Sequence, residues 1–264
     1  MAVAVQTESK SSAPAADKIL SVNNIEVIYD QIILVLKGVS LDVPKGGIVA
    51  LLGANGAGKT TTLKAISNLL HAERGDVTKG SIVFEGDEVQ DLSPNELVRR
   101  GCIQVMEGRH CFGHLTIEEN LLTGAFTRRD GKAAIRKDID LVYSYFPKLA
   151  ERRDAIAGYT SGGEQQMTAV GRALMAQPKM ILLDEVMAGL RPTEAQYMVD
   201  LIRSLRMRGI TFVLVEHIME IIMRISDRVV VIGAGENVCE GSPEKVAHDP
   251  RVIDIYLGEE ISLA

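Results

Sequence analysis

Several features are scarce in this chain of 264 residues. It has no tryptophan and only 4% aromatic residues, so its core must consist mainly of aliphatic side chains and methionine. No apolar run approaches the length that spans a bilayer. The net charge is −6, the isoelectric point is near 5.5, and no basic stripe is present. These absences argue against a membrane-spanning protein and predict that nucleic acid is not a partner.

Cysteine is also scarce, and the N-terminus lacks an export signal. Cys102, Cys111 and Cys239 include no pair at zinc-ligand spacing, and their odd number favours free thiols in a reducing compartment. Residues 1–18 are rich in Ala and Ser but have neither the basic nor the apolar region of a secretory signal. We therefore expect a disordered tail over 1–18 and a cytoplasmic protein.

The length allows one large domain or two small ones, and we expect 19–264 to form a single domain. The hydrophobic share of 46% is enough for a core. Short apolar segments that alternate with helical stretches predict a parallel sheet covered on both faces, in an α/β fold. The strands are expected at 48–52, 81–84, 103–106, 180–183, 211–215 and 228–232, after strand-like segments at 27–29 and 32–36. Between about 107 and 165 strand signals vanish, which predicts a helical subdomain with helices over 117–126 and 133–146.

Residues 53–60 read Gly-Ala-Asn-Gly-Ala-Gly-Lys-Thr, directly after the apolar run 48–52 and before a helix expected over 59–70. Glycines let such a loop curl so that backbone N–H groups point at phosphate oxygens, while the lysine adds a cation and the threonine a hydroxyl for Mg²⁺. The alternative is a glycine-rich turn that binds nothing, but its position between strand and helix argues against that. The residues expected to bind the nucleotide are Gly53, Ala54, Asn55, Gly56, Ala57, Gly58, Lys59, Thr60 and Thr61.

Two carboxylates follow the apolar run 180–183. A buried strand would place Asp184 and Glu185 at its carboxyl end, where ligands bind in open α/β sheets. We expect Asp184, together with Thr60, to hold Mg²⁺, and Glu185 to orient and polarise the attacking water. The alternative is that the two acids merely cap the next helix.

A Ser-Gly-Gly-Glu sequence at 161–164 precedes another helical stretch, which is expected to run to about 176. Ser161 and Glu164 have the spacing of a capping box, so a well-capped helix would explain those two residues. It does not explain the glycine pair, Gly162 and Gly163. Two glycines at a helix N-terminus allow a phosphate to approach the backbone closely, which predicts a second contact with a nucleotide.

The order of these motifs resembles ABC-type ATPases, over roughly residues 20–258. That resemblance implies a P-loop NTPase fold with a parallel-sheet core, a small antiparallel β subdomain and a helical subdomain, as well as ATP hydrolysis with Mg²⁺. It implies that Tyr29 stacks on adenine, although a single tyrosine is more often core or surface. It also implies that His217 reaches the terminal phosphate, and that Ser161, Gly162 and Gly163 contact the nucleotide of a second ATPase subunit in a head-to-tail dimer.

The chain departs from the family pattern at several positions. Glu107 stands where the family has the glutamine that links the ATP site to the membrane partner; a carboxylate there can still ligate Mg²⁺ or water, whereas Gln104 belongs to the strand before it. Arg191 replaces an aspartate in a loop that normally crosses the dimer interface, which favours a paralogous rather than identical partner. Val186 replaces a proline, and Thr160 replaces a common leucine.

Further segments resemble the ATPases of branched-chain amino acid importers, in particular the shorter of the two. They are Glu107-Gly108-Arg109, 145–149, 161–167, 240–244 and 256–258. This resemblance implies two membrane permease subunits, a periplasmic solute-binding protein and a location at the inner face of the cell membrane. Related importers for urea, amides or aromatic acids, an exporter, and a soluble ABC ATPase remain as alternatives, and a phosphate-loop kinase would not need the Ser-Gly-Gly-Glu-Gln sequence.

Overall fold

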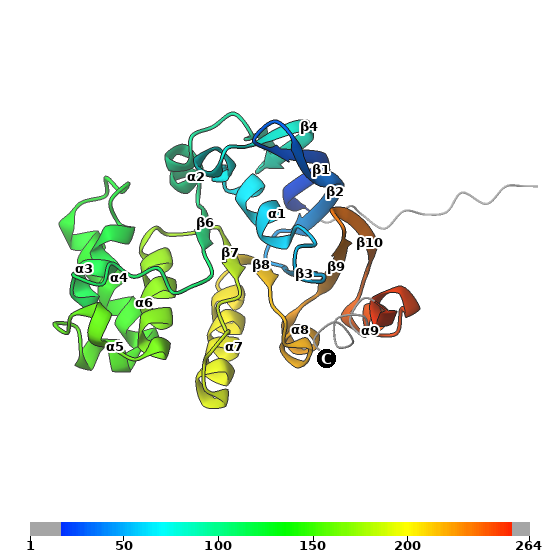
Figure 1. Ribbon diagram of the computed structural model, residues 1–264. Coiled ribbons are helices and arrows are strands. Elements are labelled where there is room, and N and C mark those ends of the chain that lie inside the picture. The colour runs from blue at the N-terminus through cyan, green and yellow to red at the C-terminus, as the bar shows by residue number, and fades with distance from the viewer. Residues whose placement is uncertain (1–16, 255–264) are drawn as a thin grey trace, which may run out of the picture.

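The computed structural model describes residues 17–254, which form two sheets and a helical lobe (Figure 1). The larger sheet has six strands in the order β10-β9-β3-β8-β7-β6, of which only β10 runs antiparallel to its neighbour. Every residue of β3, β7 and β8 is buried. Its strands are β3 (Ile48–Leu52), β6 (Cys102–Val105), β7 (Met180–Asp184), β8 (Thr211–Val215), β9 (Arg228–Gly233) and β10 (Glu236–Gly241).

Both faces of this sheet are covered, as the sequence predicts. Alternate residues of β7 belong to two different hydrophobic clusters: Ile181 and Leu183 pack with α6 and α7, whereas Met180 and Leu182 pack with α1 and the smaller sheet. The helices of the sheet layers are α1 (Lys59–Ile66), α2 (Pro94–Arg100), α6 (Gly162–Met175), α7 (Pro192–Met207), α8 (Met219–Ile225) and α9 (Pro243–Ala247).

The predicted helix over 59–70 is wrong at its end. α1 stops at Ile66, and a separate 3₁₀ turn η1 (Leu70–Glu73) follows. Asn68 lies between them with φ +58°, and its side-chain amide donates to the carbonyl oxygens of Val89 and Leu92. An asparagine that tolerates a left-handed conformation and bonds to a distant backbone segment ends the helix early.

The smaller sheet is antiparallel, in the order β2-β1-β4-β5. Its strands are β1 (Lys18–Tyr29), β2 (Ile33–Pro44), β4 (Gly75–Phe84) and β5 (Asp87–Glu88). β1 and β2 are longer than the two short segments expected, because bulges let them continue through polar positions. β1 begins at Lys18, the last residue of the predicted tail. Residues 1–16 of that tail lie outside the described residues, as does the segment 256–258.

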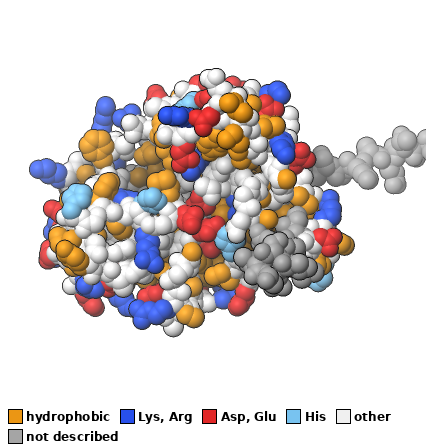
Figure 2. Space-filling model, viewed as in Figure 1, with side chains coloured by type: hydrophobic (Ala, Val, Ile, Leu, Met, Phe, Trp, Pro, Cys, Tyr) orange, Lys and Arg blue, Asp and Glu red, His pale blue; other side chains and the backbone are white. Residues whose placement is uncertain are grey.

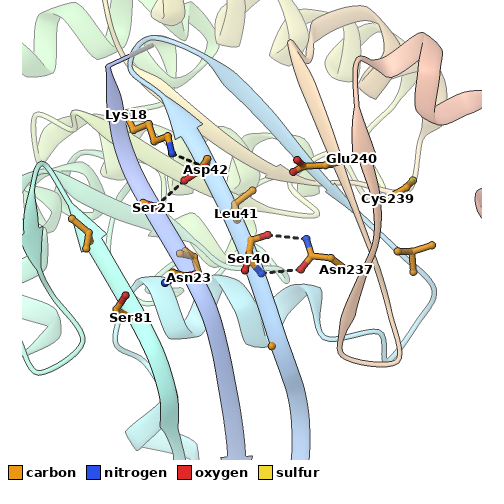
Figure 3. A pocket seen from close by; sticks show the side chains of 14 residues that line it. Lys18, Ser21, Asn23, Ser40, Leu41, Asp42, Ser81, Asn237, Cys239 and Glu240 are labelled. Atoms are coloured by element: carbon orange, nitrogen blue, oxygen red, sulfur yellow. Dashed lines mark hydrogen bonds and ion pairs between the residues drawn. The ribbon is translucent and has the colours of Figure 1, made fainter. Parts of the chain in front are cut away.

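The two sheets join through a pair of hydrogen bonds between β2 and β10. The Ser40 N–H donates to Asn237 Oδ1 and Asn237 Nδ2 donates to the Ser40 carbonyl, each at 2.8 Å (Figure 3). A pocket of about 700 Å³ lies beside this junction and is lined by β1, β2, β4 and β10. Its lining contains no residue that the sequence analysis assigns to nucleotide binding.

The helical lobe contains α3 (Ile117–Gly124), α4 (Lys132–Tyr145), α5 (Pro147–Glu151) and η2 (Ala157–Tyr159), and it lies to the side of the sheet (Figure 1). α6 packs on α3, and a Cβ atom at Gly124 would lie 2.0 Å from the carbonyl oxygen of Arg172 on α6. α6 therefore belongs to this lobe as well, and the predicted limit of 165 falls inside a helix that continues to Met175. Within the described residues, no helix has the length and apolar character required to cross a membrane.

Candidate nucleotide-binding and hydrolysis site

The predicted phosphate loop lies between β3 and α1. At Gly53 a Cβ atom would lie 2.1 Å from the carbonyl oxygen of Ile232 on β9, and at Gly58 it would lie 2.5 Å from Leu36 Cδ2 on β2. Both glycines also have positive φ, so no other residue fits there without moving a neighbour. The loop is thus held against both sheets.

Lys59 lies inside this loop rather than in solvent. Its ammonium donates to the carbonyl oxygens of Gly53 and Ala54, at 2.7 and 3.0 Å, and its side chain is 6% exposed. These two bonds place a cation at the N-terminus of α1, where it can meet an anion together with the loop N–H groups. Asn55 and Gly56 are exposed at the rim, Ala57 is buried, and Thr61 is half-buried in the first turn of the helix.

The predicted acids meet the loop at the carboxyl edge of the sheet, because β3, β8 and β7 are parallel neighbours. Thr60 Oγ1 lies 3.3 Å from Asp184 Oδ1. Burial raises the pKa of Asp184 to about 6, against a lowering effect of the Thr60 hydrogen bond and with further raising by nearby carboxylates. Figure 2 shows acidic side chains gathered near the middle of this face. A buried carboxylate beside a hydroxyl is a place for a cation.

Glu185 follows Asp184 with φ +50°, and its N–H donates to the carbonyl of Val215 on β8. His217 comes from the residues after β8, and its Nε2 lies 2.5 Å from Glu185 Oε1. The structure thus brings Glu185 and His217 together, at the edge where Asp184 and Thr60 meet. This pair can hold and polarise a water molecule.

Sequence reasoning missed one carboxylate at this edge. Glu216 is 3% exposed, accepts a hydrogen bond from the N–H of Met187 at 3.0 Å, and has its pKa raised to about 7, first by burial and then by Glu185 and Asp184. It ties the end of β8 to the loop after β7. Its signal in the sequence was an acid directly after a buried strand, the same signal that singled out Asp184.

Glu107 is exposed in the loop after β6, near enough for its charge to help raise the pKa of Asp184. Gln104 lies within β6, as expected, where its Oε1 accepts a 2.5 Å hydrogen bond from the hydroxyl of Ser67 on the segment after α1. Gln104 therefore serves packing between α1 and the sheet. Glu107 is the residue of this loop that lies near the acid cluster, which comprises Asp184, Glu185 and Glu216.

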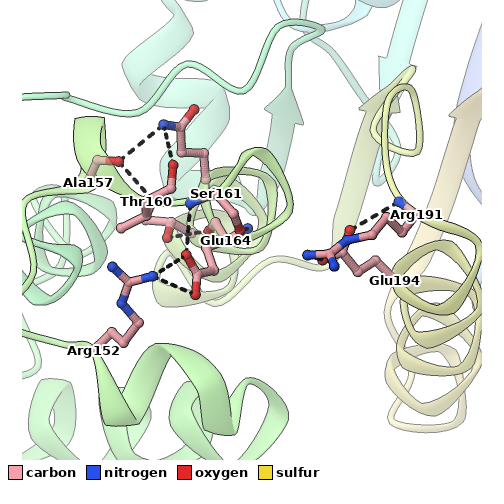
Figure 4. Close-up of polar contacts among 9 residues, drawn as sticks. Arg152, Ala157, Thr160, Ser161, Glu164, Arg191 and Glu194 are labelled. Carbon is pink, nitrogen blue, oxygen red and sulfur yellow. Dashed lines mark hydrogen bonds and ion pairs between the residues drawn. The ribbon is translucent and has the colours of Figure 1, made fainter.

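The Ser-Gly-Gly-Glu sequence forms the predicted capping box at the start of α6 (Figure 4). The N–H of Glu164 donates to Ser161 Oγ at 3.2 Å, and the N–H of Ser161 donates back to Glu164 Oε2 at 2.8 Å. Arg152 donates to both oxygens of the same carboxylate. Burial acts to raise the pKa of Glu164, but hydrogen bonds from Ser161 and Arg152 together outweigh it and hold this pKa below its ordinary value.

The ends of two charged side chains lie close to the signature glycines, Gly162 and Gly163, and would have to move to admit a larger residue. A Cβ atom at Gly162 would lie 2.6 Å from the guanidinium carbon of Arg109, and one at Gly163 would lie 2.7 Å from the carboxylate of Glu194. Glu194 also accepts from the N–H of Arg191 and pairs with its guanidinium at 3.3 Å (Figure 4). Arg191, the departure from the family's aspartate, is thus held by its own chain. The prediction that these glycines bind a second nucleotide is not tested by these contacts.

Tyr29 ends β1 and is half-buried, with its ring packed over Gly75 at the start of β4. A Cβ atom at Gly75 would lie 2.7 Å from the ring, so the glycine provides a flat seat for the tyrosine. The stacking of Tyr29 on adenine stays a prediction.

A family model for the ABC transporter matches residues 36–188, which include the phosphate loop, the signature glycines, Asp184 and Glu185. The chain belongs to the ABC transporter family. A second model, for the branched-chain amino acid ATP-binding cassette transporter, matches residues 236–262 at the C-terminal end. The predicted resemblance is thereby confirmed, and with it the ATPase class.

Among curated proteins, this ABC subunit is 40% identical over 240 residues to BraG of Pseudomonas aeruginosa, a high-affinity branched-chain amino acid transport ATP-binding protein, covering 90% of this chain and 99% of BraG. It is 31% identical to BraF of the same organism, covering 86% and 93%, and 34% identical to the lipopolysaccharide export ATP-binding protein LptB of Haemophilus influenzae, covering 87% and 93%.

The solved structure of the ATP-binding cassette MJ1267 in its ADP conformation matches this ABC subunit with a TM-score of 0.81 at 30% identity, covering 91% of this chain and 99% of that one. The predicted fold class is thus confirmed, with its parallel-sheet core, antiparallel β subdomain and helical lobe.

Proposed function

We propose that this chain is the energy-coupling ATPase subunit of an importer for branched-chain amino acids. The observation that carries the proposal is the meeting of phosphate loop, Asp184, Glu185 and His217 at one sheet edge, in a chain whose C-terminal segment matches the branched-chain amino acid family. The same segment favours import over the lipopolysaccharide export for which LptB is named.

Mg²⁺ fits the site. Within the described residues no group of three His, Cys, Asp or Glu side chains could hold a metal by itself. Mg²⁺ needs no such cage, because it keeps several waters and binds one or two protein oxygens together with substrate phosphates. Thr60 and the buried Asp184 would supply those oxygens, and Glu107 lies close enough to contribute through water. The ion would neutralise phosphate charge during transfer.

Glu185 and His217, which lie together at the sheet edge, would carry out the hydrolytic step. Glu185 polarises a water molecule whose oxygen attacks the terminal phosphorus, and the bond between that phosphorus and the ADP oxygen breaks. Glu185 accepts the hydrogen bond from the water, while His217 orients the carboxylate and reaches toward the transferred phosphate. Lys59 and the loop N–H groups balance the charge of the phosphates.

The signature glycines lie in the helical lobe, at the N-terminal end of α6. We infer that Ser161, Gly162 and Gly163 complete the nucleotide site of a second ATPase subunit in a head-to-tail dimer. Pseudomonas aeruginosa has two relatives named for the same transport, BraG and BraF, which favours a paralogous partner. The retention of Arg191 by its own Glu194 fits a dimer whose two interfaces differ.

The membrane subunits would bind in an apolar groove between the sheet edge and the helical lobe. A pocket of about 710 Å³ lies there, and Phe126 and Phe112 expose 90% and 46% of their surfaces in it. Large exposed apolar side chains of this kind mark a protein interaction site. A cytoplasmic helix of one permease subunit would fill this groove, and the second ATPase of the dimer would receive the other permease. The ATPase would then lie at the inner face of the cell membrane.

A transport assay tests the proposal as a whole. The chain is co-purified with a second ATPase, two permeases and a periplasmic binding protein from the same organism, and the complex is reconstituted in vesicles. We expect ATP-driven uptake of leucine, isoleucine or valine. Uptake of urea, an amide or an aromatic acid in their place would correct the solute and keep the coupling role. ATP hydrolysis without any membrane partner in the complex would favour a soluble ABC ATPase instead.

A further inference from the structure

The loop after β6 presents two opposite charges, on Glu107 and Arg109, only two residues apart. Three consecutive residues between β6 and α3 have positive φ: Gly108 at 92°, Arg109 at 71° and His110 at 35°. Non-glycine residues seldom adopt this conformation, and it persists where surrounding contacts maintain it. The turn sends the two charged side chains to different neighbours.

Glu107 faces the acid cluster of its own chain, where its charge acts on Asp184. Arg109 instead reaches the helical lobe. A Cβ atom added to Gly162 would lie 2.6 Å from Arg109 Cζ and 2.7 Å from both terminal guanidinium nitrogens. Gly189 belongs to the loop after Glu185, and a Cβ atom added to it would lie 3.5 Å from the same guanidinium. Arg109 thus lies against the N-terminal end of α6 and the loop after β7, both of which the proposed dimer needs.

The guanidinium of Arg109 is exposed and makes no ion pair within 4.0 Å among residues 17–254. Its neighbours differ in this respect: Arg152 is paired with Glu164 and Arg191 with Glu194. Arg109 lies against two glycines and has no carboxylate partner in this range, so its guanidinium N–H groups can donate to an anion. Arginine binds phosphate through two parallel N–H donors, so a phosphate is the ligand that this geometry suits.

We propose that Arg109 binds the terminal phosphate of the nucleotide held by the neighbouring ATPase subunit. This inference rests on the proposed function, which places Gly162 against that nucleotide. One loop then serves two ATP sites: Glu107 contributes to the site of its own chain and Arg109 to the site of its neighbour. Since the loop also borders the groove for the membrane subunits, seating of a permease helix would set the position of both charges together.

The test compares Arg109→Ala, Arg109→Gln and Arg109→Lys in the complete complex with its membrane partners. Arg153→Ala is the matched control, because Arg153 is also an exposed arginine of this region, 54% exposed and 3.7 Å from Asp154. Steady-state ATP hydrolysis is measured for each complex. Binding of a fluorescent ATP analogue and thermal unfolding are measured on the isolated chain, which reports the phosphate loop alone.

We expect kcat to fall about 100-fold in Arg109→Ala and Arg109→Gln, the usual effect of removing one preorganised donor from a developing charge. Arg109→Lys should recover part of the loss, and nucleotide binding and melting of the isolated chain should not change. A fall of less than tenfold, or equal loss in Arg153→Ala, overturns the inference while hydrolysis by the wild-type complex leaves the proposed function intact. Absence of hydrolysis in the wild type itself overturns both.

Discussion

This chain contributes two half-sites for ATP, the phosphate-loop side and the signature side, and they are held in place by different interactions. On the phosphate-loop side, Gly53 and Gly58 are fixed by backbone and apolar contacts with β9 and β2, and Asp184 ends a fully buried strand. On the signature side, Glu164 and Glu194 are held by arginines with 45% and 74% exposed side chains. The first half is part of the core, and the second is assembled on the surface.

This difference has consequences for how each half tolerates change. Buried backbone contacts cannot adjust without disturbing the sheet, so the loop should be intolerant of substitution. Exposed ion pairs contribute up to about 1 kcal/mol each, so the signature side can vary in sequence at small cost. A half-site that meets a different partner chain can then diverge, while the other half keeps the chemistry.

The largest expected effect concerns the core side. Glu185→Gln removes the carboxylate that polarises the water, and we expect kcat for ATP hydrolysis to fall about 10²- to 10⁴-fold, the range for loss of a general base. Binding of ATP should remain, because the glutamine keeps the shape and the phosphate loop is untouched. Steady-state hydrolysis and equilibrium nucleotide binding measure the two effects separately. A hydrolysis rate equal to that of the wild type would remove Glu185 from the mechanism.

Glycine substitutions within the phosphate loop test whether packing against the sheets holds it in place. Gly53→Ala brings a Cβ atom 2.1 Å from a backbone oxygen of β9, so we expect a loss of several kcal/mol in the free energy of unfolding, and loss of ATP binding. Gly56→Ala is the matched control: nothing lies within 4 Å of its Cβ, and only the strain of φ +77°, about 1 kcal/mol, is added. Equal losses in urea unfolding would show that packing against β9 does not hold the loop.

Much of the structure on the phosphate-loop side could be predicted from the sequence, because each feature there depends on neighbouring residues. An apolar run before Gly53 and another before Asp184 are enough to place both at one sheet edge, since parallel strands share their carboxyl ends. The capping box of Ser161 and Glu164 was equally local, and the structure confirms it.

Contacts between distant segments could not be predicted in this way. Arg109 on Gly162, and Glu194 on Gly163, join residues tens of positions apart whose meeting depends on how the helical lobe packs on the sheet. The end of α1 was missed for the same reason, because Asn68 bonds to Val89 and Leu92 rather than to its own helix. Glu107 was identified only by counting along a family pattern.

The pKa values of the acid cluster provide a third test, of intermediate size. Asp184 and Glu216 have folded-state pKa values raised from 3.8 to about 6 and from 4.5 to about 7. Between about pH 4 and 7 the folded protein therefore holds more protons than the unfolded chain, and stability without Mg²⁺ should fall as pH rises through this window. Asp184→Asn removes one buried charge and should raise stability at pH 8 by about 1 to 3 kcal/mol, with little gain near pH 4.

Urea unfolding in the presence of a chelator measures this effect, with Asp154→Asn as control because Asp154 is 92% exposed. Added Mg²⁺ and ATP should stabilise the wild type at pH 8 more than Asp184→Asn, since an amide is a poor ligand for the ion. A variant that is no more stable than the wild type at pH 8 would mean that the Asp184 charge is already compensated without the metal.

The smallest expected effect lies on the signature side. Glu164→Ala removes both the capping carboxylate and the partner of Arg152, so we expect a loss of about 1 kcal/mol in the free energy of unfolding. Arg152→Ala leaves the cap and removes only an exposed pair, so its loss should be below about 1 kcal/mol. Glu164→Gln keeps the hydrogen bond to Ser161 N and should lie between them. Losses here as large as that of Gly53→Ala would mean that the signature helix is as rigidly built as the phosphate loop, and the contrast between the two halves would disappear.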